Sequence, residues 1–151
     1  MEWVALVTWV LTAGGGFVML AIWLSRGGMQ QREDSRRIRP PLILGHFLLA
    51  ATGLVIWIIY IASDSSALAW VAFVILAVVA LLGFTMFAIW ARQRQERPVA
   101  QAPASPGNPS TAGPGAEPAE QHFPVSIVTL HGLLAVVTVV LVFLVAVGVG
   151  D

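Results

Sequence analysis

The chain has 151 residues, of which 58% are hydrophobic and only 11% are charged, and its mean hydropathy is +0.84. Soluble domains usually carry about a quarter charged residues, so this composition excludes an ordinary water-soluble fold. Eight Arg, with no Lys, balance eight acidic residues, so no net basic field favours nucleic acid as a partner. The absence of Cys excludes disulfides and thiol chemistry. These features indicate a small integral membrane protein.

Four apolar stretches, at residues 3–24, 42–62, 68–91 and 125–148, are each long enough to cross a bilayer core, which takes about 20 helical residues. A helix satisfies its own backbone hydrogen bonds in lipid, whereas an open strand does not. No basic segment precedes the first stretch, so we expect a retained helix and not a cleaved signal peptide. We therefore predict an all-α fold, a bundle of four transmembrane helices in the lipid bilayer.

The arginines predict the orientation of this bundle. All eight lie either between the first two spans or just after the third, and the segment 63–66 and both termini carry none. The positive-inside rule then places both Arg-rich loops in the cytoplasm and both termini outside. The Arg-only, Ala- and Val-rich composition associates the chain with a bacterial plasma membrane. Residues 98–121 hold six of the nine prolines, and we predict that they form a disordered cytoplasmic linker.

The spans contain an internal repeat. Residues 3–23 align without a gap on residues 70–90, an offset of 67, with 11 identities in 21 positions. The matches include the pairs Trp3 and Trp70, and Trp23 and Trp90, which apolar composition alone does not readily align. A weaker match at an offset of 85 relates the second and fourth spans. We predict a duplicated helical hairpin, with repeat 1 at about 3–62 and repeat 2 at about 70–148, related by a pseudo-twofold axis along the membrane normal.

Two histidines, His46 and His131, correspond under this repeat and lie inside the second and fourth spans. Ionisable residues within a span are costly and usually face the protein interior, where they are candidates for function. They follow the prolines that open their spans by five and seven residues. At 1.5 Å per residue this is roughly 8–10 Å below the cytoplasmic end of the helices. We expect the two side chains on opposite walls of the bundle at one depth.

Such a pair can ligate haem iron axially from both sides. Gly16, Gly83 and Gly53 are the residues we expect to leave clearance for the ring. Three cytoplasmic arginines, Arg26, Arg39 and Arg92, are the expected partners of its propionates. The sequence thus predicts one haem b site with His46 and His131 as axial ligands.

The His46 and His131 pair on two helices of a four-span bundle resembles the small membrane b-type cytochromes, of which the cytochrome b561 group is the best known. Members of that group carry two His pairs for two haems, whereas this chain has one pair within its spans. The resemblance therefore implies a single haem b near the cytoplasmic face and electron transfer with a membrane redox partner. The same features are compatible with a family of bacterial four-span proteins of another kind.

Three other interpretations stay open. Met19 and Met86 lie at similar depth to the histidines, and two His with two Met would suit copper. A cofactor-free accessory or assembly subunit of a larger membrane complex would also have apolar helices. An interior His can instead hydrogen-bond a neighbouring carbonyl with no cofactor at all. No motif of an enzyme with its own substrate is present, so an electron carrier or an accessory protein is the expectation.

Overall fold

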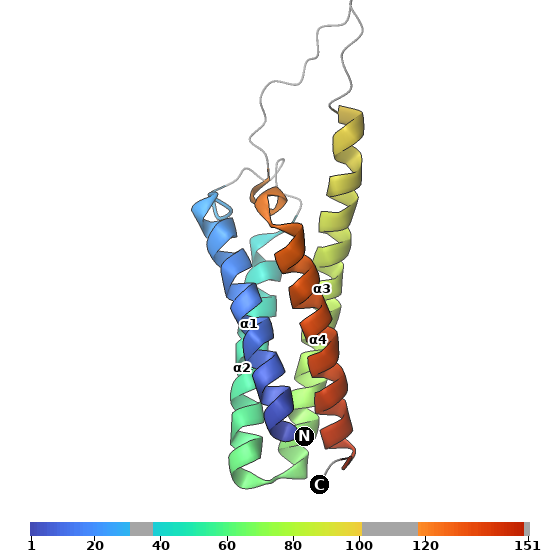
Figure 1. The fold of residues 1–151 in the computed structure, drawn as a ribbon. Helices are drawn as coiled ribbons and strands as arrows, with labels where there is room; N and C mark the ends of the chain where they lie inside the picture. The colour runs from blue at the N-terminus through green and yellow to red at the C-terminus, as the bar shows by residue number, and fades with distance from the viewer. Residues whose placement is uncertain (31–37, 101–117, 150–151) are drawn as a thin grey trace, which may run out of the picture.

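The computed structural model describes residues 1–30, 38–100 and 118–149, and for 96–100 the backbone only. Within these residues the chain forms four α-helices and one 3₁₀-helix: α1 (Glu2–Ser25), α2 (Pro40–Ser63), α3 (Ser66–Ala100), η2 (Ala119–His122) and α4 (Val125–Ala146) (Figure 1). All four α-helices are long and apolar enough to cross a membrane. The prediction of an all-helical bundle with four candidate spans is confirmed.

Short sequence signals set the ends of the helices. Arg39 and Pro124 have extended backbones, and α2 and α4 begin at the residue after each. At the end of α1, Gly27 has a φ of +73°, and the Gly28 N–H donates to the Trp23 carbonyl at 2.9 Å. This is a Schellman ending, for which glycine is favoured because it adopts positive φ without strain. The chain therefore leaves α1 in a tight turn.

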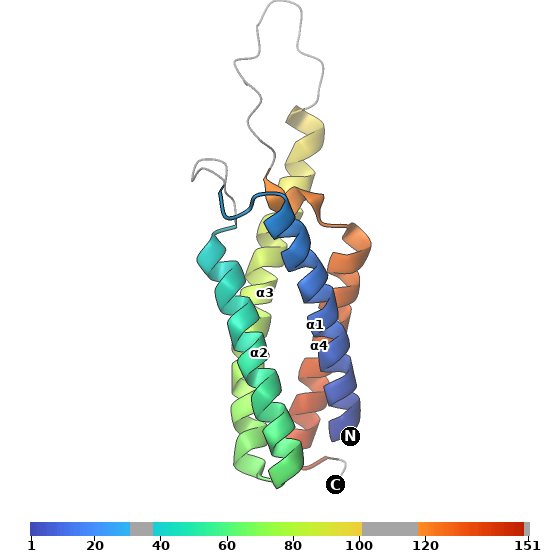
Figure 2. The same ribbon diagram turned by 90° about the vertical axis from the view of Figure 1, so that its left-hand side faces the viewer.

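The helices run alternately up and down, and α1 packs mainly along α4 while α2 packs mainly along α3 (Figures 1 and 2). The start of α1, the end of α4 and the turn between α2 and α3 lie at one end, which we call the terminal end. We call the opposite end the arginine end, because Arg26, Arg39, Arg92 and Arg94 follow or precede the helices there. Two helix pairs thus face each other across the bundle.

The tightest packing lies toward the terminal end. Trp57 and Trp9 are buried there with their ring centroids 6.4 Å apart, and Tyr60 stacks 4.8 Å from Trp57. Small residues let the helices approach this aromatic group, since Ala5 and Ala72 are both fully buried. The bundle is therefore closed by aromatic side chains at this end.

The outer surface of the helices is strongly apolar. Leu81 and Phe84 are 70% and 71% exposed, and large hydrophobic side chains are exposed along all four helices. Soluble monomers rarely show apolar surface on this scale. The exposed surface is that of a multi-pass membrane protein in contact with lipid.

The structure differs from the predicted linker of 98–121 at both ends. Helix α3 continues through Pro98 to Ala100, and η2 occupies 119–122. Ala119 and Glu120 are buried at the arginine end, where the Glu120 carboxylate accepts the Ile38 N–H and the Gln93 side-chain amide, both at 3.3 Å. These contacts bury the carboxylate, so this end of the linker is part of the bundle. Residues 101–117 of the predicted linker lie outside the described residues.

Candidate functional site

His46 on α2 points across to α3. Its Nδ1 lies 3.0 Å from the carbonyl oxygen of Val79. A carbonyl oxygen can only accept, so Nδ1 carries the proton and donates it to this bond. In a neutral imidazole the Nε2 atom then keeps its lone pair, which is the arrangement found in histidines that bind metals.

His131 on α4 makes the corresponding contact with α1. Its Nδ1 donates to the carbonyl oxygen of Thr12 at 2.8 Å. Thr12 and Val79 differ by 67 residues, the same offset that relates Trp3 and Trp70, and the histidines differ by 85. The two imidazoles are therefore held by matching carbonyls in the two helix pairs.

The two rings face one another across the bundle. Their centroids are 6.4 Å apart, and their planes are inclined at 57°. A metal ion bound between one nitrogen of each ring would hold the centroids about 6 Å apart, because each bond is about 2 Å long and each nitrogen lies about 1 Å from its centroid. The observed separation matches this spacing.

Gly83 and Gly16 form the cradles in which the imidazoles lie. A Cβ atom at Gly83 would be 3.1 Å from Cε1 of His46, and one at Gly16 would be 3.3 Å from Cε1 of His131. Both distances are shorter than ordinary van der Waals contact. The structure therefore brings together four of the predicted site residues, two histidines and two glycines.

Gly53 does not belong with them, and the expectation that it clears space for a ring is wrong. A Cβ atom there would lie 3.1 Å from Trp9 and 3.2 Å from Ile75. Gly53 thus makes room for the buried indole of Trp9. Its position two turns beyond His46 places it in the aromatic packing toward the terminal end.

The remaining predicted residues lie nearer the arginine end. Arg26, Arg39 and Arg92 are exposed there. Arg26 is ten residues beyond Gly16, roughly 15 Å along the helix at 1.5 Å per residue. Met19 and Met86 are half-buried, one turn beyond Gly16 and Gly83.

Large buried side chains close the site above and below, a feature that the sequence analysis missed. On α1, Trp9 and Trp23 stand seven residues before and after Gly16. On α3, Leu76 and Trp90 flank Gly83 in the same way, and all four large side chains are at most 6% exposed. Residues seven apart lie on one face of a helix, so this spacing was a readable signal. We call the space bounded by these residues and the imidazoles the histidine chamber.

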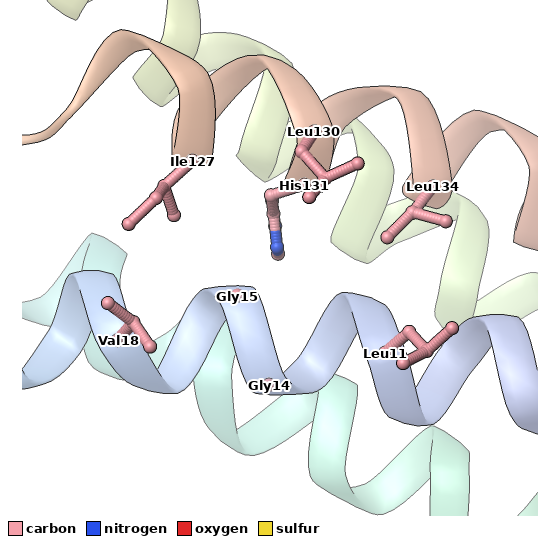
Figure 3. Close-up of a pocket in the computed structure, with 8 residues that line it drawn as sticks. All are labelled: Leu11, Gly14, Gly15, Val18, Ile127, Leu130, His131 and Leu134. Carbon is pink, nitrogen blue, oxygen red and sulfur yellow. The ribbon is translucent and has the colours of Figure 1, made fainter.

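A small hollow of about 170 Å³ lies between α1 and α4 beside this chamber (Figure 3). His131 lines it together with apolar side chains, and Gly14 and Gly15 leave it open on the α1 side. Leu11 and Leu130 at its rim are more than half exposed. The positions that match the two glycines in the repeat are Leu81 and Leu82, so the sequence does not repeat this feature.

The donor set bears on what the site can hold. Within the described part of the chain, no group of three or more His, Asp and Glu side chains gathers to hold a metal ion. Two imidazoles alone leave most positions of a metal ion unfilled. Haem brings four nitrogen ligands of its own and needs only axial ligands from the protein. The pair of imidazoles with glycine cradles therefore fits haem better than a bare ion.

No family model matches the chain, and neither a curated protein nor a solved structure matches it.

Proposed function

We propose that the protein binds one haem b through His46 and His131 and transfers single electrons within the membrane. The observation that carries this proposal is the geometry of the pair: ring centroids 6.4 Å apart, with each Nδ1 engaged by a carbonyl of the facing helix. A carbonyl bond by itself also suits an interior histidine without cofactor. The ring separation and the second nitrogen of each ring are what favour a shared metal centre.

Haem iron supplies one-electron redox chemistry when it is bound. The chain contributes the two ligands, fixes their tautomer through Thr12 and Val79, and surrounds them with apolar helices that exclude water. The flanking glycines hold the imidazoles close to α1 and α3. An electron carrier needs no further catalytic group.

The proposal includes a duplicated hairpin and a defined orientation. The matched contacts of His46 with Val79 and of His131 with Thr12 support the duplication, because both partners keep the offsets of the sequence repeat. The Arg distribution supports a bacterial plasma membrane protein with the arginine end in the cytoplasm and both termini outside.

The visible spectrum of purified protein expressed with ample haem tests the proposal. We expect a Soret band in the wild type and its loss in His46→Ala and His131→Ala. His122→Ala is the matched control, since it removes the third histidine of the chain, which lies in η2, and it should keep the band. A colourless wild type would refute haem binding and favour the accessory subunit, and metal analysis of the same sample would test copper.

A further inference from the structure

Two tryptophans near the arginine end carry buried indole N–H groups with no hydrogen-bond partner. Trp23 on α1 is 1% exposed and Trp90 on α3 is 6% exposed. The Nε1 atom of each is shielded from solvent and unbonded. Buried indole N–H groups normally find an acceptor, because leaving one unpaired costs stability. Two such donors, at matching positions of the repeat, indicate acceptors that the chain itself does not supply.

The helical register places both indoles over the histidine chamber. Trp23 follows Gly16 by seven residues and Trp90 follows Gly83 by seven, so each shares a face with the glycine that cradles an imidazole. The two turns between them span roughly 10 Å, and helix side chains lean toward the helix N-terminus. The indoles therefore lean back from the arginine end toward the imidazoles.

The opposite side of the chamber offers no such donors. Trp9 and Leu76 form its apolar floor, and the nearby Trp57 already donates its indole N–H to the Glu2 carbonyl at 3.4 Å. At the arginine end the buried acid, Glu120, bonds to Ile38 and Gln93 and leaves both indoles unpaired. The chamber thus has one apolar side and one side with two free donors.

We propose that Trp23 and Trp90 donate their indole N–H groups to the two carboxylates of the haem ring. This inference rests on the proposed function, and it assigns the propionates to buried indoles in place of the exposed arginines Arg26, Arg39 and Arg92. Haem has two carboxylates on one edge and hydrocarbon on the others, so the two sides of the chamber match the two kinds of edge. The carboxylate edge then faces the arginine end.

Soret titration with haemin and with haemin dimethyl ester tests the assignment. The ester keeps the ring and the iron but removes both charges. Hydrogen bonds to charged groups are the strong ones, so we expect the wild type to prefer haemin over the ester by about tenfold for each indole. The preference should collapse in the double variant Trp23→Phe with Trp90→Phe.

The matched control is Trp3→Phe with Trp70→Phe, which removes another pair of repeat-related tryptophans. These are 62% and 43% exposed, and the control should keep the wild-type preference. An unchanged preference in the Trp23 and Trp90 variant would overturn the assignment while leaving haem binding intact. Absence of any Soret complex in the wild type would instead overturn the proposed function, and the assignment with it.

A second measurement needs no variant and covers the case in which the double variant fails to fold. The six indole N–H signals of ¹⁵N-labelled protein can be followed while diamagnetic cobalt(III) protoporphyrin is added. Hydrogen bonding to carboxylates should shift two signals downfield with the free acid and not with its dimethyl ester. Identical shifts with both compounds would contradict the assignment.

Discussion

Replacing Gly83 by alanine should weaken haem binding by moving His46. The added Cβ would lie 3.1 Å from Cε1 of the imidazole, so the ring must yield by a few tenths of an ångström. Its 3.0 Å bond to the Val79 carbonyl would then pass the usual limit of about 3.2 Å for such bonds. Changes of this kind around metal ligands typically cost about 10–100-fold in affinity. At about 1.4 kcal/mol per tenfold, the expected loss is about 1.4–2.8 kcal/mol.

Gly45→Ala is the matched control. Gly45 adjoins His46 on α2, and a Cβ there would have no neighbour within 4 Å. Both substitutions raise helix propensity by up to about 1 kcal/mol, so the comparison removes this contribution. Haem affinity is measured by Soret titration in detergent, with helix content followed by circular dichroism. Equal affinity of Gly83→Ala and Gly45→Ala would refute the reasoning that the cradle positions the ligand.

Three further predictions concern the bundle. In this cysteine-free chain, Ser66→Cys should react with an impermeant thiol reagent added outside intact cells and Gln95→Cys should not; the reverse pattern would contradict the proposed orientation. Glu120→Ala should lower the free energy of unfolding in detergent by about 1–3 kcal/mol, because it strands two buried donors, and Glu120→Gln should cost less. Gly53→Ala should cost about 1–3 kcal/mol through overpacking against Trp9, with haem affinity retained, and a loss of haem affinity at full stability would return this glycine to the site.

Much of the site was readable from the sequence because its residues recur at matching positions. His46, His131, Gly16 and Gly83 were predicted together, and the structure places each imidazole against a predicted glycine. The chamber's large side chains could also have been found, since Trp9 and Trp23 follow the seven-residue spacing about Gly16. The partners that orient the imidazoles could not, because a backbone carbonyl has no signature in the sequence.

Two errors show what spacing along one helix leaves open. Gly53 shares a helical stripe with His46, yet the neighbouring helix places Trp9 against it. The end of the linker has the composition of a disordered segment, yet Glu120 is buried there by contacts with Ile38 and Gln93, which are distant in the chain. In both cases the deciding atoms belong to another segment.

Hydropathy and length determined the four helices by themselves, because each helix satisfies its own backbone hydrogen bonds and needs no partner to form in lipid. Only the tertiary structure decided which helices pair and how each is rotated about its axis. In an almost uniformly apolar chain, polar and apolar faces do not fix that rotation. Close packing of indoles, glycines and imidazoles does, because a Cβ or a ring fits only where the facing helix leaves room.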